Sequence, residues 1–260
     1  MSVKDLAGKR AWVTGGGKGI GRSIAHALAA RGARVLVTGR DEAALAAVVG
    51  EIACAAGSAR HLVCDVRDPD ALEAAAAHAV SLFGGLDVVV ANAGISGRTP
   101  VGEARERARD IVETNLLGAY YTFAAALPRM SGPGRLLAVS SVLAKFGVPG
   151  YAAYCASKAG VLGLVRALAH EAAPKRITVN AIVPGWVDTD MADEGLAEIG
   201  RATGQTPAEV KADAVKAFPL GRFVEPGEVG ALAAFLAGPS GDAITGQALS
   251  ICGGATAFGG

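Results

Sequence analysis

The chain has few cysteines, little net charge and no long apolar segment, and each shortage excludes a class of function. Its four cysteines and four histidines are scattered among 260 residues, without the spacing of metal ligands or of a disulfide framework. A formal net charge of +1 leaves no electrostatic footprint for nucleic acid or for an acidic membrane. We therefore expect reduced thiols, no metal ion and no nucleic-acid partner.

Segments of membrane-spanning length are also missing. No run of about 18 uncharged apolar residues occurs. The start of the chain, Met1 to Leu6, lacks the apolar run of a signal peptide. We therefore expect a cytoplasmic protein without a membrane segment. Hydrophobic residues make up 51% and charged residues 19% of the chain, which favours one large domain over residues 1–260.

Short apolar runs alternate with longer helical patterns. Candidate strands are 10–14, 34–38, 60–64, 86–91, 135–140, 178–182 and 247–251, and candidate helices are 20–31, 41–55, 69–83, 103–130, 151–172 and 226–237. Continuous apolar runs are typical of strands buried on both faces. The alternation predicts a Rossmann-type, doubly wound α/β fold with a parallel sheet. The rhythm is interrupted at about 186–218, which we interpret as a substrate lid or a surface insertion.

A glycine-rich turn joins the first strand to the first helix. It begins at Thr14 and ends at Gly21, with a spacing that differs from the usual dinucleotide fingerprint. Glycines let a pyrophosphate approach the backbone, and a helix N-terminus supplies N–H donors. The turn therefore predicts a dinucleotide site. Its candidate contacts are Gly15, Lys18, Gly19, Ile20 and Gly21.

The end of the second strand indicates which dinucleotide binds. An acidic residue there would bind the ribose 2′-hydroxyl, whereas the chain has Arg40. Arg40 and Lys18 are both suited to pair with a 2′-phosphate, which favours NADP(H). Asp41 follows immediately. It either caps the next helix or reaches the ribose, and this second role keeps NAD(H) as the alternative.

Tyr154 and Lys158 form the chemically most informative pair. A spacing of four residues places them on one face of a helix. A nearby cation favours phenolate over phenol, so the tyrosine becomes a proton donor or acceptor near neutral pH. Ser141 lies thirteen residues upstream, at the end of an apolar run. The set predicts acid–base chemistry at a carbonyl or alcohol, although the pair alone also fits an amphipathic helix with an exposed lysine.

Together these elements resemble the short-chain dehydrogenase/reductase family. The resemblance covers nearly the whole chain and implies a seven-stranded parallel sheet, a nicotinamide cofactor and a homotetramer. The matching elements are Thr14-Gly15-x-x-x-Gly19-x-Gly21, Asp65-Val66, Asn92-Ala93-Gly94, Asn115-Leu116, Ser141, Tyr154-x-x-x-Lys158 and Pro184-Gly185.

The resemblance also implies a role for each catalytic residue. Tyr154 is the acid–base residue, and Lys158 lowers its pKa and binds the nicotinamide ribose. Ser141 orients and polarises the substrate oxygen, and Asn115 supports a water relay to the lysine. Further implied cofactor contacts, besides the tyrosine and the lysine, are Asp65, Val66, Asn92, Ala93, Gly94, Pro184, Gly185, Val187 and Thr189.

The C-terminal segments look like the β-ketoacyl and polyketide ketoreductase branch of this family. Residues 222–226 and 248–254 carry that likeness, which implies reduction of ketones on thioester-linked chains by NADPH. One alternative is an NAD-dependent secondary-alcohol or hydroxyacyl-CoA dehydrogenase, and another is a dinucleotide-binding sensor without catalysis. Trp186 either flanks the substrate or packs the lid onto the sheet. Apolar candidates for lining the substrate site are Val142, Leu143, Phe146, Val148, Trp186 and Met191.

Overall fold

The computed structural model describes residues 4–216 and 218–257, which form a sheet of seven parallel strands covered by helices. The strand order is β3-β2-β1-β4-β5-β6-β7. The sheet confirms the predicted doubly wound α/β fold. The strands are β1 (Arg10–Thr14), β2 (Arg34–Gly39), β3 (Ser58–Val63), β4 (Val88–Ala91), β5 (Gly134–Val139), β6 (Ile177–Pro184) and β7 (Ala248–Ile251).

The strand order reverses between β1 and β4. The chain first builds outward from β1 through β2 to β3, and then returns to place β4 on the other side of β1. Val13 of β1 is in register with Val37 on one side and with Val90 on the other. Open α/β sheets bind ligands at such a switch point, outside the carboxyl ends of the strands.

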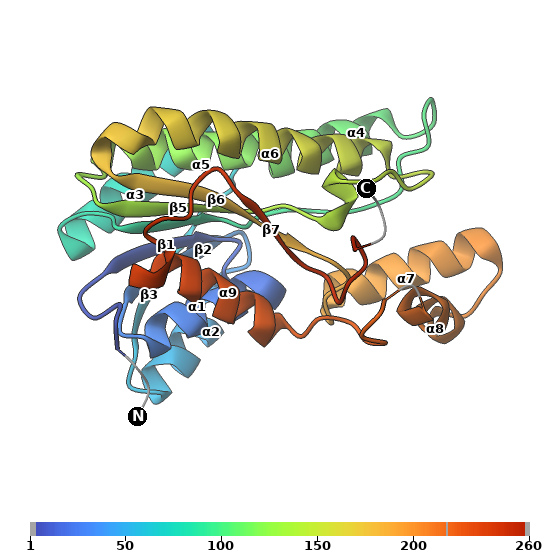
Figure 1. The fold of residues 1–260 in the computed structure, drawn as a ribbon, viewed down its shortest axis with the longest axis horizontal. Helices are drawn as coiled ribbons and strands as arrows, with labels where there is room; N and C mark the ends of the chain where they lie inside the picture. The colour runs from blue at the N-terminus through green and yellow to red at the C-terminus, as the bar shows by residue number, and fades with distance from the viewer. Residues whose placement is uncertain (1–3, 217, 258–260) are drawn as a thin grey trace.

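Helices cover both faces of the sheet (Figure 1). Neighbouring residues of β1 show why the strands read as unbroken apolar runs: Trp12 and Val13 belong to the two opposite core clusters, and both are fully buried. One face is covered by α1 (Gly19–Ala30), α2 (Glu42–Cys54) and α9 (Pro226–Ala237), and the other by α3 (Pro69–Phe83), α5 (Gly118–Ala126) and α6 (Ala152–Ala172).

The predicted helix over 103–130 is wrong as a single element. It consists of α4 (Arg105–Val112), a π-helical turn (Glu113–Leu117), α5 and a final 3₁₀ turn (Leu127–Arg129). The π-helical turn holds Asn115, which is buried. An i→i+5 turn rotates the side chains that follow it around the helix axis. These side chains therefore face a direction that a regular α-helix would not give them.

Several strand boundaries also differ from the prediction by one or two residues. β3 begins at Ser58 rather than at residue 60, because Ser58 still pairs with Arg34 of β2. β4 begins at Val88 rather than at residue 86. The Asp87 carboxylate accepts the Arg10 backbone N–H at 2.8 Å and the Arg10 side chain at 2.7 Å. The Asp87 side chain therefore satisfies the Arg10 backbone N–H just before the hydrogen-bond ladder between β1 and β4 begins.

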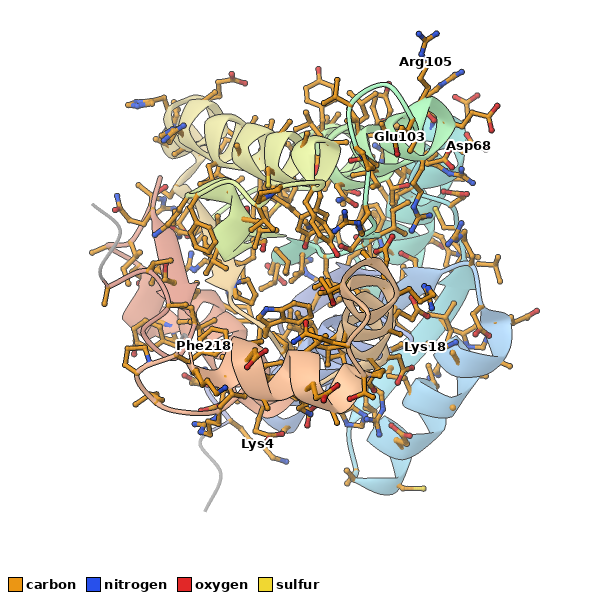
Figure 2. All side chains as sticks on the ribbon, turned by 90° about the vertical axis from the view of Figure 1, so that its right-hand side faces the viewer. Lys4, Lys18, Asp68, Glu103, Arg105 and Phe218 are labelled. Carbon is orange, nitrogen blue, oxygen red and sulfur yellow. The ribbon has the colours of Figure 1, made fainter. Side chains whose placement is uncertain are left out.

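The predicted excursion after β6 is a pair of helices, α7 (Asp190–Thr203) and α8 (Pro207–Lys216), beyond the carboxyl ends of the strands (Figures 1 and 2). Trp186 stacks on Phe223 with ring centroids 5.5 Å apart, so it packs the base of this lid. Residue 217 of the predicted lid, and residues 1–3 and 258–260 of the predicted domain, lie outside the described residues. The small core of the lid consists of Ala192, Leu196, Val210, Phe218 and Phe223.

Candidate active site

The glycine turn is packed so closely that side chains do not fit. Gly15 has a φ of +64°, and a Cβ there would lie 2.8 Å from the Ala93 Cα. A Cβ at Gly21 would lie 2.1 Å from the Gly15 carbonyl oxygen. No side chain in the described part of the chain caps α1 at Lys18. The backbone amides at the start of α1 are therefore presented to a ligand, which fits the predicted dinucleotide cradle.

Asn92 holds this turn against the end of β4. Its side-chain amide donates to the carbonyl oxygens of Thr14 at 3.0 Å and Gly15 at 3.1 Å. Its backbone N–H donates to the Thr14 hydroxyl at 3.1 Å. Asn92 thus supports the shape of the turn, and its predicted direct contact with a cofactor stays a prediction.

Beside the turn, the ends of β1 to β4 surround a cavity of about 430 Å³. Asp41 accepts the Ala44 N–H at 3.1 Å, so it caps α2, and it also pairs with Lys18 at 2.7 Å. This ion pair raises the pKa of Lys18 and lowers that of Asp41. Asp65 pairs with Arg67, a partner that the sequence did not indicate. Predicted cofactor residues in the cavity wall are Gly15, Lys18, Arg40, Asp65, Val66, Ala93 and Gly94.

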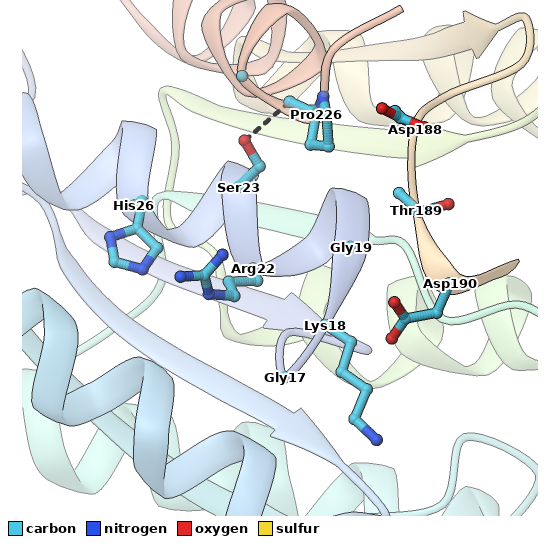
Figure 3. A pocket seen from close by; sticks show the side chains of 11 residues that line it. Gly17, Lys18, Gly19, Arg22, Ser23, His26, Asp188, Thr189, Asp190 and Pro226 are labelled. Carbon is cyan, nitrogen blue, oxygen red and sulfur yellow. Dashed lines mark hydrogen bonds between the residues drawn. The ribbon is translucent and has the colours of Figure 1, made fainter. Parts of the chain in front are cut away.

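A second group of predicted contacts follows β6. A Cβ at Gly185 would lie 3.0 Å from the Cys252 Cα, so the chain passes close to β7 there. Thr189 caps the N-terminus of α7, and its methyl group would lie 3.3 Å from a Cβ at Gly19. Gly19 and Thr189, together with Lys18 and Asp190, line a pocket of about 540 Å³ (Figure 3). The lid therefore starts directly against the glycine turn.

Ser141, Tyr154 and Lys158 meet at the carboxyl end of β5. Ser141 follows β5 and is 8% exposed, whereas Lys158 on α6 is 4% exposed. The Lys158 ammonium donates to the Val139 carbonyl oxygen at 2.9 Å and lies 5.8 Å from the centroid of the Tyr154 ring. The structure thus brings together three residues that the sequence separates by up to seventeen positions.

Burial shifts the pKa values of this group. Burial raises the pKa of Tyr154, and a hydrogen bond with Ser141 lowers it by less. Burial also lowers the pKa of Lys158 to about 8. Burial is therefore the largest influence on both groups, and the lowering of the tyrosine pKa by the lysine stays a prediction. A raised pKa keeps the proton on the phenol at neutral pH, which fits the predicted role of Tyr154 as a proton donor.

Asn115 clamps the segment after β4. Its side-chain oxygen accepts the Ile95 N–H at 2.8 Å, and its side-chain nitrogen donates to the Ile95 carbonyl at 2.9 Å and to Ser157 at 3.2 Å. Ser157 in turn donates to the Tyr154 carbonyl at 2.8 Å. A Cβ at Gly94 would lie 3.3 Å from the Lys158 nitrogen. Ser157 was missed from the sequence because it resembles any small residue of a helix, and the water relay stays a prediction.

This arrangement defines a class of protein. The doubly wound sheet places a glycine cradle at its switch point, next to a serine and a tyrosine that offer two hydrogen-bond donors to one oxygen. Such a site belongs to a dinucleotide-dependent oxidoreductase that acts on a carbonyl or an alcohol.

Comparison with known proteins identifies the family. A family model described as enoyl-(acyl carrier protein) reductase matches residues 15–256. The chain therefore belongs to the short-chain dehydrogenase/reductase family. A Streptomyces coelicolor protein provisionally named ketoacyl reductase is 40% identical over 250 residues, which cover 94% of this chain and 95% of that protein. The 3-oxoacyl-(acyl-carrier-protein) reductase FabG of Staphylococcus aureus is 38% identical over 251 residues, covering 95% and 97% of the two chains.

A solved structure agrees with this assignment. The structure of an actinorhodin polyketide ketoreductase variant with NADPH has a TM-score of 0.93 and 38% identity. The match covers 99% of this chain and 100% of that one. The predicted family and its ketoreductase-like branch are thus confirmed.

Proposed function

We propose that this protein is an NADPH-dependent ketoreductase that reduces the keto group of a 3-oxoacyl thioester or a related apolar ketone. The observation that carries the proposal is the juxtaposition of Ser141 and Tyr154 with Lys158 beside the glycine cradle. The activities for which the FabG relative and the actinorhodin ketoreductase are named support the substrate class. We assign this activity to one domain, residues 1–260, with a substrate lid at 186–218.

Arg40 supports NADP(H) as the cofactor. The competing carboxylate, Asp41, already pairs with Lys18 and caps α2. Arg40 is exposed in the wall of the cavity, and no carboxylate of the described residues forms an ion pair with it. A 2′-phosphate is the ligand that suits such a guanidinium. When bound, NADPH would supply the hydride for the reduction.

The residues of the chain supply the proton and the electrostatic support. The Ser141 hydroxyl donates a hydrogen bond to the ketone oxygen, and Tyr154 transfers its phenolic proton to that oxygen as negative charge develops. A raised pKa keeps the phenol protonated at neutral pH, which favours reduction. Lys158 holds its place by donating to the Val139 carbonyl and anchors the region into which the nicotinamide ribose would fit.

The outer face of the α5–α6 layer supports self-association. The helical segment Ala152–Lys175, which includes α6, is long and apolar enough to cross a membrane by length and composition alone, yet it packs on the sheet. Only 33% of its most apolar window is buried. Leu117 and Tyr120 beside it are 37% and 50% exposed. We therefore infer a cytoplasmic homotetramer that covers these surfaces.

The decisive assay measures reduction of an acetoacetyl thioester with NADPH and with NADH. We expect turnover with NADPH to exceed turnover with NADH by at least about thirtyfold, because Arg40 contributes a charge-assisted contact. Robust NAD-linked oxidation of a secondary alcohol without NADPH-linked reduction would instead support the alcohol or hydroxyacyl-CoA dehydrogenase. Binding of NADPH without any turnover would support the sensor.

A further inference from the structure

The loop after β4, residues 95–101, joins the catalytic group to the lid. At its start, both backbone polar groups of Ile95 are bonded to Asn115. Three residues later, the Arg98 backbone N–H donates to the Glu198 carboxylate at 2.9 Å. Glu198 belongs to α7, so this hydrogen bond joins two segments that are 100 positions apart in the sequence.

The N-terminal end of α6 holds the same loop from the other side. The Thr99 N–H donates to the Gly150 carbonyl at 2.6 Å, and the Thr99 hydroxyl accepts the Ala153 N–H at 3.3 Å. Thr99 is only 4% exposed. Residues 98 and 99 are therefore fixed between the lid and the first turn of the helix that carries Tyr154.

Tyr151 lies next to both Arg98 and Glu198. Its side chain is buried, and its hydroxyl faces the Glu198 carboxylate. Burial first, and then the negative charge of Glu198, raises the pKa of Tyr151 to about 12, whereas the positive charge of Arg98 lowers it. Both charges therefore lie close to a phenol that stays neutral. The Arg98 guanidinium itself lies over Gly150, where a Cβ would approach it to 3.1 Å.

We propose that Glu198 is a positioning residue for ketone binding. By accepting the Arg98 amide proton, it holds α7 against the 95–101 loop, one turn of α6 away from Tyr154. The ketone must reach Tyr154 past these elements, so their relative position sets how well it binds. The inference rests on the proposed function, because it assigns Glu198 to binding of the ketone. Glu198 does not bond to Ser141 or Lys158 in the described structure, so its removal changes KM more than kcat.

The test compares four variants with the parent protein. Glu198→Ala removes the acceptor, and Glu198→Asp keeps the charge but withdraws it by one methylene group. Glu198→Gln keeps an oxygen acceptor at the same reach. Glu194→Ala is the matched control, because it removes an exposed carboxylate from the same helix. Each protein is assayed for kcat and KM with an acetoacetyl thioester and NADPH. Hydrogen–deuterium exchange of the α7 amides is measured without substrate.

We expect Glu198→Ala and Glu198→Asp to raise KM about tenfold and to speed α7 exchange about tenfold, as for the loss of one hydrogen bond. In both variants kcat should change less than about threefold. Glu198→Gln should stay within about threefold of the parent in both measurements, because an amide oxygen still accepts from Arg98. Glu194→Ala should match the parent.

Parental KM and parental α7 exchange in Glu198→Ala would overturn the proposal. So would a Glu198→Gln variant as impaired as Glu198→Ala, since the charge and not the acceptor would then matter. Hydrogen–deuterium exchange of the β1 and β4 amides shows whether the sheet of each variant is intact. If these amides lose their protection in Glu198→Ala, Glu198→Asp is used in its place. A parent protein that does not reduce the thioester would refute the proposed function, whereas unchanged α7 exchange in the variants would refute the role of Glu198 independently.

Discussion

The two halves of the active site are built in different ways. On the cofactor side, the turn from Gly15 to Gly21 lies against β4 with no room for a Cβ, and Asn92 ties it down with two side-chain hydrogen bonds. On the substrate side, α7 and α8 depend on a core of five buried residues, a Trp186–Phe223 stack and the Glu198 hydrogen bond.

The difference shows how one fold combines a cofactor site of fixed geometry with a substrate site that can adapt. Strand ends in a buried sheet cannot move without disturbing the core, so the cofactor side is preorganised. A pair of helices with a small core of its own would open at low free-energy cost, as the proposed role as a substrate lid requires. Ser141 and Tyr154 stand at the boundary, on the rigid end of β5 and on α6.

The largest effect should come from changing Tyr154, which stands between the cofactor side and the substrate side. We expect Tyr154→Phe to lower kcat about a thousandfold, because it removes the positioned proton donor. The affinity for NADPH, measured by fluorescence titration, should change less than about threefold, since the glycine cradle is untouched. Parental turnover in this variant would contradict the role of Tyr154.

A smaller but still large effect is expected from the cofactor side. In Gly21→Ala the new Cβ would meet the Gly15 carbonyl oxygen at 2.1 Å, so the turn must shift. We expect about a hundredfold weaker NADPH binding and about 2 kcal/mol lower free energy of unfolding. Gly50→Ala on α2 is the control, because nothing lies within 4 Å of its Cβ. It should stabilise the protein by about 0.5–1 kcal/mol. Equal NADPH affinity and equal free energy of unfolding in Gly21→Ala and Gly50→Ala would refute the close packing around Gly21.

The two halves also differ in how much of them the sequence predicts. The sheet and the glycine turn follow from local signals, because apolar runs and glycine spacing specify strands and a tight turn directly. The bonds from Asn115 to Ile95 and from Glu198 to Arg98 do not. They join distant segments, and the first depends on a π-helical turn that a regular helical pattern conceals. The effect of burial on the tyrosine pKa is hidden for a related reason: spacing reveals a neighbour, but it does not reveal burial.

The next effect in size concerns which cofactor the rigid half of the site prefers. We expect Arg40→Ala to raise the KM for NADPH about thirtyfold and to leave the KM for NADH within about twofold, because only the 2′-phosphate contact is lost. Steady-state kinetics with both coenzymes measures this. Arg105→Ala is the control, since Arg105 is an exposed arginine of α4 that does not line the cavity. An unchanged preference in Arg40→Ala would show that Asp41 or Lys18 selects the cofactor instead.

The smallest expected effect is a pH dependence of stability that arises at the boundary. Burial lowers the pKa of Lys158 from 10.5 to about 8, so the unfolded chain holds this proton up to a higher pH than the folded one. The free energy of unfolding therefore rises with pH between about 8 and 10.5, as the buried charge is neutralised. From pH 7 to pH 9 the gain is about 1 kcal/mol, since each pKa unit corresponds to about 1.4 kcal/mol. Urea unfolding of the parent and of Lys158→Met isolates this contribution, because other groups titrate equally in both. A difference between the two proteins that is constant with pH would show that Lys158 stays charged, held by the Val139 carbonyl more strongly than burial opposes it.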